Sequence, residues 1–529
     1  MNTLRILYHV ALADFFERTR RYSFLLTLAA VIAMGVLVNN GSVYFDIKQL
    51  NPELYSLSYR GELNSAWIGT MTVLVINFLL GLFGFYLVSD CIERDIRTGV
   101  GQIIATTPIR RATYLVGKWI SNFVVLSVQV LILAVAAVIM VLLQSEAALD
   151  LEALLMPFLA VALPYMALIA ALAVVFETVP WLRGAVGNAV YFFLWIFLFM
   201  FSFALPNKLL FFRDPLGINV FRDSLYAGAR AAFPNDLIGG MGVGVNFPGI
   251  QLKVFNWSGL AWTPGIVGGQ WLWAVFGLGL ILLSTVWFAR FDPSREGLQR
   301  MRGKPKQAKE SESAEPRKRA PRMALASLSP LISKLAQANP FLGVLFAELR
   351  LLLKGRRWWW WLGMAGLNIA ILSDLPPEVK PYLVFGWLWP LAIWSEMGNR
   401  ERKNNTSQMV FSSTRPVLRQ LPAAWLAGVL ATALFFIAWA VVPLSNGDLP
   451  ALGGWAGAVI FVPTLALALG VFSSGNRVFE VVYLVWWYIG AFMKMPGMDF
   501  TAGAPQIYLL AAAGLLLLSV FWRGRQVRV

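Results

Sequence analysis

Acidic and basic side chains alternate in two segments of this sequence, residues 89–108 and 395–414, and each segment follows a long apolar run. Such a pattern suits ion pairing and docking to a partner protein, because acids favour the positive end of a short helix and a proline then ends it. A constant offset relates the segments, so we infer that one module was duplicated. The offset pairs Ser89 with Ser395, Asp90 with Glu396, Arg94 with Arg400, Asp95 with Glu401, Arg97 with Lys403, Gln102 with Gln408, and Thr106 and Thr107 with Ser412 and Ser413, and a two-residue slip then pairs Pro108 with Pro416 and Arg111 with Arg419.

The sequence shows no catalytic constellation. The nearest approach to a nucleotide-binding loop, Gly297 through Gly303-Lys304-Pro305, has one residue too many and a proline where Ser or Thr must bind Mg²⁺. His9 is the only histidine and Cys91 the only cysteine, which excludes an intrachain disulfide and a thiolate metal site. We therefore expect that the chain is not an enzyme and binds no metal or cofactor directly.

The composition indicates a membrane protein. Hydrophobic residues form 58% of the chain, charged residues only 14%, and the mean hydropathy is +0.65, which is too apolar for a protein with a fully hydrated surface. The net charge of +16 would also fit nucleic-acid binding, but Lys and Arg gather in particular loops between apolar runs, as in an inner-membrane protein. We expect a multi-pass protein of the bacterial cytoplasmic membrane, surrounded by lipid, with no nucleic-acid partner.

Apolar runs long enough to cross a bilayer recur along the whole chain. They predict an all-α polytopic membrane protein with about twelve transmembrane helices in two sets of six. The first set is expected at 22–40, 65–89, 117–143, 152–176, 185–205 and 267–289, and the second at 358–374, 381–395, 424–446, 452–473, 478–493 and 506–522.

An even number of helices in each half gives both halves the same orientation, so we predict parallel repeats with both termini in the cytoplasm. The loops assigned to the cytoplasm are positive or contain Arg, and the opposite loops carry few positive charges, as the positive-inside rule requires. Each half opens with an amphipathic stretch, residues 2–19 and 341–355, that we expect to lie along the cytoplasmic interface.

These features divide the chain into three parts. Residues 1–290 form a first transmembrane domain, 291–340 a basic cytoplasmic linker, and 341–529 a second transmembrane domain. The first domain includes an outer segment at about 206–266, which mixes aromatic, charged and glycine residues. That segment is too apolar for simple disorder, so we expect partly folded structure over the outer mouth, with no counterpart in the second half.

Within the first repeat copy, residues 93–118 read Glu-Arg-Asp-x-x-x-Gly and then Ile-x-Ala-Thr-x-Pro-x-x-Arg-x-x-Tyr-Leu-x-Gly-Lys. This run resembles the first cytoplasmic loop of ABC-2 type permeases, the membrane subunits of ATP-driven exporters. The resemblance implies two paired six-helix domains fused in one chain, each with a coupling helix that seats in a separate ATPase. The second copy departs from the pattern at Asn399 and Asn405 and has no clear equivalent of Lys118, which implies a weaker second contact.

The resemblance also implies the partners and the residues that contact them. The expected partners are two cytoplasmic ABC ATPase subunits, which would supply ATP and Mg²⁺, and the expected cargo is a small amphipathic or lipid-like molecule moved outward, such as a drug, a natural product or a peptide. The residues assigned to coupling are Glu93, Arg94, Asp95, Arg97, Thr98, Gly99, Thr107, Pro108, Arg111, Arg400, Glu401, Arg402, Ser412, Ser413, Pro416 and Arg419.

Polar residues at or within the predicted spans are candidates for gating or for the substrate pathway, because charges buried in a membrane are usually functional. They are Asp90, Glu396, Asn77, Gln129 and Glu177. Asp90, Glu396 and Glu177 are expected at interfaces, where a charge costs little. The two amides would equally suit hydrogen bonds between neighbouring helices.

Two other classes of membrane protein stay open. A transporter driven by an ion gradient would need charged residues within its spans, or broken helices at matching positions of the two halves. Pro164 and Pro463, in the fourth and tenth predicted spans, weakly meet the second condition. A polytopic membrane enzyme would need a catalytic constellation, which the sequence does not show.

Overall fold

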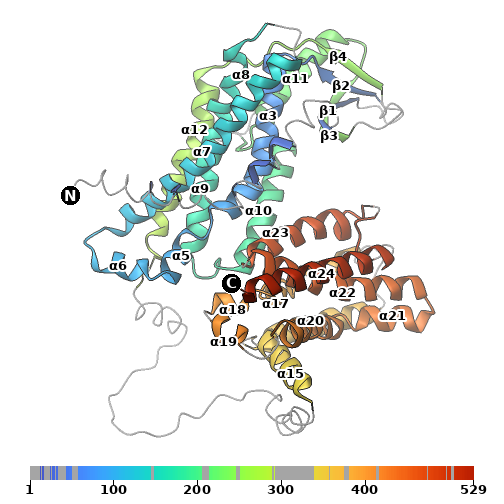
Figure 1. Cartoon of the computed structure of the whole chain (residues 1–529). Helices are drawn as coiled ribbons and strands as arrows, with labels where there is room; N and C mark the ends of the chain where they lie inside the picture. The colour runs from blue at the N-terminus through green and yellow to red at the C-terminus, as the bar shows by residue number, and fades with distance from the viewer. Residues whose placement is uncertain are drawn as a thin grey trace. The chain divides into compact units, whose positions relative to one another are not determined.

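The structure is a computed structural model, and the chain divides into two compact units, Met1–Lys306 and Gln307–Val529 (Figure 1). Each unit has its own helices. The residues that the structure describes are 12, 15, 16, 24, 27–29, 31–33, 43–49, 57–144, 148–204, 214–245, 251–288, 291, 339–354, 356, 358–373, 380–404, 406–412, 416–473, 475–495, 497–501 and 505–528.

In the first unit, long apolar helices surround α9 (Leu163–Thr178), which is buried along nearly its whole length. Two π-helical turns interrupt the long helices of this unit: η2 (Leu80–Gly84) lies between α3 and α4, and η3 (Phe158–Ala162) leads directly into α9. Polar side chains fix where the helices begin; for example, Asn64 accepts a hydrogen bond from the Trp67 backbone N–H at 2.9 Å. The other helices are α3 (Ser65–Leu79), α4 (Phe85–Val88), α5 (Cys91–Arg97), α6 (Val100–Thr106), α7 (Arg111–Gln144), α8 (Leu151–Pro157), α10 (Ala185–Ala204), α11 (Ile218–Ala232) and α12 (Pro264–Ser284).

Within the described residues, eight helices are long and apolar enough to cross a membrane. Five lie in the first unit and correspond to predicted spans; the first predicted span, 22–40, lies largely outside the described residues. Three lie in the second unit, where two further apolar helices are shorter. The chain is thus a predominantly helical, multi-pass protein, and the layout of twelve spans in two repeats stays a prediction. The eight helices are Ser65–Ile96, Arg111–Leu143, Leu151–Thr178, Ala185–Ser202, Pro264–Ser284, Val417–Phe435, Leu449–Ser473 and Pro505–Val527.

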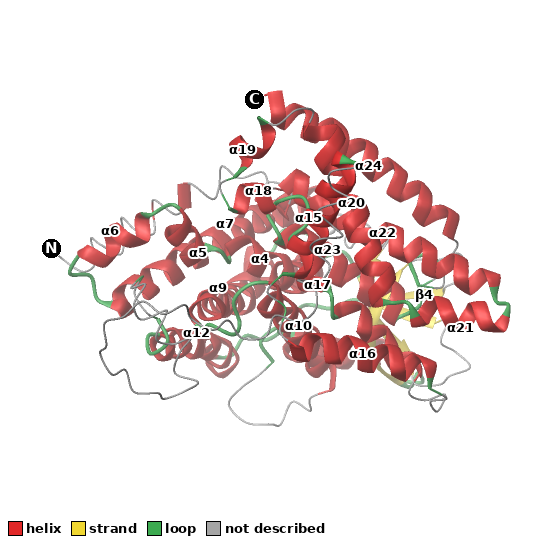
Figure 2. Cartoon of the chain, turned by 90° about the horizontal axis from the view of Figure 1, so that it is seen from below, coloured by secondary structure: helices red, strands yellow, loops and turns green. Residues whose placement is uncertain are grey.

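A four-stranded β-sheet, which the sequence did not predict, lies in the first unit (Figure 2). Its order is β3-β1-β2-β4: β1 pairs antiparallel with β2 and β3, and β2 pairs parallel with β4. The glycine-rich β3 is a poor strand by propensity, and it forms because β1 pairs with it along its length. The strands are β1 (Val43–Gln49), β2 (Leu57–Gly61), β3 (Ile238–Val245) and β4 (Gln251–Phe255).

The sheet is held by a polar contact between β2, β4 and the turn after α11. The Asp236 carboxylate accepts hydrogen bonds from the Lys253 ammonium at 2.6 Å and from the Tyr59 hydroxyl at 2.7 Å. These two bonds hold the pKa of Asp236 below its usual value. The outer segment therefore has ordered structure in its described part, and it lies at the opposite end of the first unit from α5 and α6 (Figure 1).

In the second unit, several predicted spans are interrupted. The span predicted at 424–446 is divided between α20 and α21, and the Asn368 side chain accepts a hydrogen bond at 3.0 Å from the backbone N–H of Ala438, where α21 begins. The span predicted at 381–395 is a 3₁₀ helix followed by one α-helical turn. The helices are α15 (Pro340–Leu353), α16 (Trp358–Leu372), η4 (Lys380–Leu388), α17 (Leu391–Trp394), α18 (Arg400–Lys403), α19 (Ser407–Phe411), α20 (Pro416–Phe435), α21 (Ala438–Asn446), α22 (Leu449–Ser473), α23 (Arg477–Trp486), η5 (Trp487–Phe492) and α24 (Pro505–Arg528).

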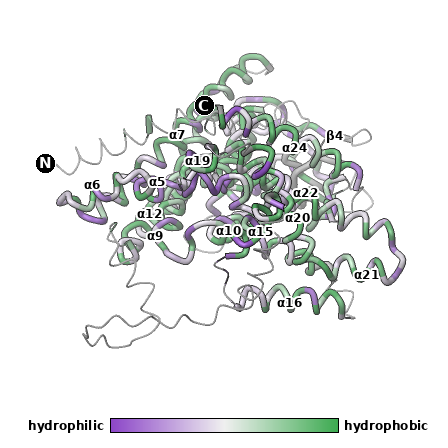
Figure 3. Tube along the Cα trace, turned by 60° about the horizontal axis from the view of Figure 1, so that its bottom comes forward, coloured by the Kyte–Doolittle hydropathy of each residue, from purple (hydrophilic) through white to green (hydrophobic). Residues whose placement is uncertain are grey.

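Aromatic side chains form the centre of the second unit. Trp387 lies flat on Phe436, with ring centroids 3.9 Å apart, and Trp394 donates a hydrogen bond to the Thr432 hydroxyl at 2.8 Å. In both units the long helices are mainly hydrophobic, whereas hydrophilic residues gather in short helices such as α5 and α6 (Figure 3).

The end of α22 lies directly against the backbone of the turn before α18. A Cβ atom on Gly470 would stand 2.0 Å from the carbonyl oxygen of Met397, and a Cβ on Gly398 would stand 2.5 Å from that of Leu467. Gly398 also has a φ of +77°, which side chains of L-residues rarely adopt. Glycine at both positions is thus required for this close approach.

We expect Gly470→Ala to lower the thermal stability of the protein, because the added methyl group would overlap a backbone carbonyl. Overpacking of this kind typically costs about 1–3 kcal/mol. Gly514 in α24 is a matched control, since nothing lies within 4 Å of its Cβ position, and Gly514→Ala should gain up to about 1 kcal/mol of helix stability. Thermal unfolding of each purified variant in detergent measures the difference, and equal midpoints would contradict the close approach.

Candidate functional site

The two duplicated segments form short bends between longer helices, one in each unit. We call residues 89–111 the first bend and residues 395–416 the second bend. The first contains α5 and α6, and the second contains α18 and α19. In both, two short helices follow each other closely along the chain, and a long helix, α7 or α20, comes next.

The first bend begins at a helix N-terminus that the Glu177 carboxylate caps. Asp90 has a φ of 85° and donates its backbone N–H to Glu177 Oε1 in a short contact. The N–H groups of Cys91, Ile92 and Glu93 bind the same carboxylate at 2.9, 2.6 and 3.1 Å. A carboxylate favours the positive end of a helix and satisfies its free N–H groups, so Glu177, from the end of α9, fixes where α5 starts.

Asp95 is the centre of the first bend. Its carboxylate accepts a hydrogen bond from the Tyr114 hydroxyl at 2.7 Å and forms an ion pair with the Lys118 ammonium at 2.8 Å. Arg94 approaches the same carboxylate at 3.5 Å. Asp95 is 3% exposed and Lys118 2% exposed. A buried ion pair of this kind tolerates the loss of neither partner alone, so it ties α5 to α7.

Aromatic rings close the other side of the first bend. The Tyr114 ring stacks on Phe288, with centroids 5.3 Å apart, and meets Phe291 edge-on. A Cβ on Gly101 in α6 would stand 2.6 Å from the Phe291 ring. Both phenylalanines follow α12, so the end of the last described helix of the first unit packs against the bend.

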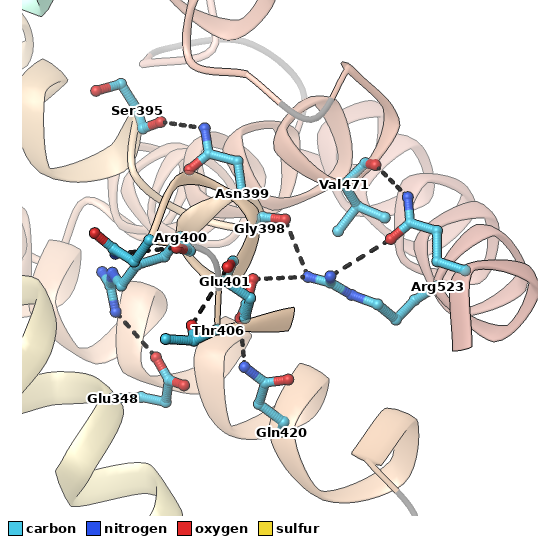
Figure 4. A network of polar contacts seen from close by, with 12 residues as sticks. Glu348, Ser395, Gly398, Asn399, Arg400, Glu401, Thr406, Gln420, Val471 and Arg523 are labelled. Carbon is cyan, nitrogen blue, oxygen red and sulfur yellow. Dashed lines mark hydrogen bonds and ion pairs between the residues drawn. The ribbon is translucent and has the colours of Figure 1, made fainter. Parts of the chain in front are cut away.

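In the second bend, Glu401 takes the place of Asp95 (Figure 4). Its carboxylate accepts a short hydrogen bond from the Gln420 amide and lies 3.5 Å from the Arg523 guanidinium. Arg523 also donates to the Gly398 carbonyl at 3.0 Å. Glu401 is 9% exposed and Arg523 4% exposed, so this bend too is built around a buried ion pair.

A second ion pair links the second bend to α15. Arg400 donates to the Glu348 carboxylate at 3.1 Å (Figure 4). Burial raises the pKa of Glu348, and the charge of Arg400 opposes that effect. In the same region, Glu396 lies 3.7 Å from Arg356. The amphipathic stretch predicted at 341–355 is helical as far as Leu353 and is attached to the bend by charge.

The two bends are built in the same way, but the cation that pairs with the buried acid comes from a different helix. In each, the acid at the corresponding repeat position, Asp95 or Glu401, is buried and paired with a buried cation. Lys118 supplies the cation from α7, whereas Arg523 supplies it from α24. The sequence showed no equivalent of Lys118, and it did not reveal Arg523, because 122 positions separate that residue from Glu401.

The outward faces of α6 and α19 correspond residue by residue. Ile103 and Met409 occupy the same repeat position and are 67% and 72% exposed. The preceding residues, Gln102 and Gln408, are exposed as well, and so are the hydroxyl residues three positions later, Thr106 and Ser412. Each bend thus presents an amide, an apolar side chain and a hydroxyl in the same order.

The other predicted coupling residues lie on or beside these faces. Glu93, Thr98, Pro108, Arg402 and Arg419 are exposed, and Arg94, Thr107 and Arg111 are half-buried. Asp95 and Glu401, by contrast, are buried and point into their own units. They therefore hold the bends in position. Gly99 begins α6 with a φ of +77°, Arg97 ends α5, Pro416 begins α20, and Ser413 lies outside the described residues.

The predicted pathway residues all contact their own unit. Asn77 donates to the Leu216 carbonyl at 2.8 Å, and Gln129 donates to the Phe24 carbonyl at 3.5 Å. Glu177 and Asp90 meet at the cap of α5, and Glu396 pairs with Arg356. Within the described residues, no group of three or more His, Cys, Asp or Glu side chains is placed to hold a metal ion.

Residues 8–231 match the family model described as ABC-2 family transporter protein. The matched region includes the whole first bend together with Glu177, and it ends before the second unit. Neither a curated protein nor a solved structure matches the chain.

We expect Asp95→Asn and Lys118→Met each to destabilise the protein, because each leaves the other charge buried without its partner. Breaking a buried pair typically costs about 3–5 kcal/mol. The double variant should lose less than the sum of the two, since no charge then stays behind. Thermal unfolding in detergent tests this, with Glu93→Gln, on an exposed side chain of the same helix, as a near-neutral control. Strictly additive losses would show that the two charges are not coupled.

For the second bend, we expect Arg523→Met to loosen residues 398–411, since both the Glu401 carboxylate and the Gly398 carbonyl lose their donor. Arg525 lies two positions further along α24 and is exposed, so Arg525→Met is a control of the same residue type on the same helix. Hydrogen–deuterium exchange should rise in peptides from the second bend only in Arg523→Met. The same exchange in both variants would show that Arg523 does not hold the bend.

Proposed function

We propose that this chain is the membrane-spanning part of an ATP-driven exporter, because residues 8–231 match the ABC-2 family of transporter proteins and eight described helices are long and apolar enough to cross a membrane. The ABC-2 family implies ATPase partners. The proposal adds that two ATPase subunits bind in the cytoplasm, one at each bend, and that they hold ATP and Mg²⁺. This chain itself then catalyses nothing.

The corresponding faces of α6 and α19 are the observation that carries this proposal. Ile103 and Met409 are apolar, exposed and at equivalent repeat positions. A single exposed apolar side chain is ordinary at a protein surface, so the support comes from finding the same arrangement in both bends. An apolar side chain flanked by an amide and a hydroxyl suits insertion into a groove with a polar rim. The second contact, which the sequence had implied to be weaker, presents the same chemistry as the first.

The buried ion pairs give each bend the stiffness that coupling needs. A force applied to α6 passes to α7 through the Asp95–Lys118 pair and to α9 through the Glu177 cap. A force applied to α19 passes to α24 through Glu401 and Arg523. ATP-driven closure of the ATPases would thus move whole helices and rock the two halves, releasing cargo to the outside. The bends then face the cytoplasm of a bacterial inner-membrane protein, with both termini on that side.

The placement of buried charge supports an amphipathic or lipid-like cargo, such as a drug, a natural product or a peptide. Within the described residues, the buried charged side chains lie in or beside the two bends, at the first turn of α23, and in the turn before α11. The middle stretches of α9 and α22 contribute none. Helices of this kind offer an apolar path, which suits a molecule that already partitions into lipid.

The structure gives less support to a transporter driven by an ion gradient. That mechanism would favour helices broken at matching positions of the two halves. Pro164 follows the π-helical turn η3, but α22 runs without a break from Leu449 to Ser473 through Pro463. The two prolines therefore do not mark equivalent breaks.

The proposal is tested by purifying the tagged chain from its native membrane and measuring transport in vesicles. We expect an ATP-binding protein with a Walker A motif to co-purify, and an amphipathic fluorescent dye to move out only when ATP is present on the cytoplasmic side. Transport that continues without ATP, with no ATPase bound, would sink the exporter proposal.

The same purified preparation tests whether the exposed faces of α6 and α19 are the docking sites. Ile103→Glu and Met409→Glu should each lower ATPase stimulation severalfold and to a similar extent, and the double variant should nearly abolish it, because a carboxylate cannot enter an apolar groove without a large desolvation cost. Leu237→Glu is the control: Leu237 is 66% exposed but lies at the other end of the first unit. Thermal unfolding should be unchanged in all variants, and unchanged stimulation in both single variants would exclude these faces as docking sites.

A further inference from the structure

A buried turn in the first unit is surrounded by polar side chains, and some of their atoms make no hydrogen bond within the described residues. Residues 214–220, the turn before α11 and its first residues, are all buried. The Asn77 amide N–H₂ donates to the Leu216 carbonyl at 2.8 Å, and that of Gln270 donates to the Asp214 carbonyl at 3.2 Å. The turn is therefore held between α3 and α12.

Several oxygen atoms around this turn have no hydrogen-bond partner among the described residues. They are the amide oxygens of Asn77, Asn219 and Gln270, whose side chains belong to residues 0%, 4% and 1% exposed. The amides of Asn77 and Gln270 cannot be turned round, because their N–H₂ groups already face carbonyl oxygens. A buried acceptor without a partner costs about 1–3 kcal/mol, so each of these three oxygens would be stabilised by a bound ion or water molecule.

A fourth oxygen belongs to Tyr165 of α9. Its hydroxyl also has no hydrogen-bond partner among the described residues. It stands 2.5 Å from the position that a Cβ on Gly81 would take, one helical turn after Asn77. The lack of a side chain at position 81 thus leaves room for this hydroxyl against the same helix that carries Asn77.

The turn also carries a negative charge that no described cation balances. The Asp214 carboxylate accepts backbone N–H groups from Gly217 and Asn219, each at 2.6 Å, and the Ser202 hydroxyl at 3.1 Å. It forms no ion pair with a described Lys or Arg. Burial raises the pKa of Asp214, as expected for a carboxylate withdrawn from water without a counter-charge, and a bound cation would reverse that effect.

We propose that this turn binds a monovalent metal cation, Na⁺ or K⁺, through the side-chain oxygens of Asn77, Asn219, Gln270 and Tyr165, with Asp214 balancing its charge. Neutral oxygen ligands with one carboxylate match a single positive charge, whereas protein Ca²⁺ sites draw on several carboxylates. The ion would hold the N-terminus of α11 against α3, α9 and α12. This inference goes beyond the exporter proposal and does not depend on it.

The test is thermal unfolding of the full chain in detergent with NaCl, KCl or choline chloride at equal ionic strength. Binding to the folded state alone raises the midpoint in a saturable way as the ion concentration rises. We expect such a rise with Na⁺ or K⁺ and none with choline. A radioactive sodium or rubidium binding assay should give one ion per chain. The same midpoint in all three salts would mean that water satisfies these oxygens, and would overturn the proposal.

Single substitutions test whether the ion binds at this turn. Gln270→Met keeps the length of the side chain but removes one ligand, so it should lose most of the salt-dependent rise while still folding. Asp214→Asn should lose all of it. Gln102→Met, on the exposed face of α6, is the control and should keep the full rise. If Gln270→Met responds to Na⁺ and K⁺ as strongly as the unaltered protein, the ion binds elsewhere and the assignment fails.

Discussion

A carboxylate that is withdrawn from water must be paired or capped, and both bends are built to meet that requirement. Asp95 is paired with Lys118, Glu401 with Arg523, and Glu177 accepts the free N–H groups at the start of α5. Each of these contacts joins a short helix to a long one. The positions of α6 and α19 relative to their own helices follow from these few buried charges.

The two units meet this requirement with residues that are not related by the repeat. Lys118 lies in α7, near Asp95 along the chain, whereas Arg523 comes from α24. The segment after α12 and the end of α24 nevertheless contact the bend of their own unit, through Phe291 beside Gly101 in one case and Arg523 in the other. The two bends are thus more alike in their layout than in the side chains that stabilise them.

Local signals in the sequence predicted the local features of the fold. The long apolar runs of the first unit that lie within the described residues are helices. Contacts between distant residues were not predictable, because no local pattern encodes them: the pairing of β1 with β3, the Glu401–Arg523 pair, and the Glu177 cap of α5. In the second unit, Pro381, Gly386 and Pro390 lie in or beside a 3₁₀ helix where hydropathy alone indicated a full span.

The long sequence separation between Glu401 and Arg523 bears on how the protein is made. The first bend finds its cation in the helix that follows at once, so its ion pair is available early in synthesis. The second bend keeps an unpaired acid until α24 has left the ribosome and entered the bilayer, 122 residues later. The second bend can therefore reach its final form only after α24 has been made, whereas the first bend can form soon after α7.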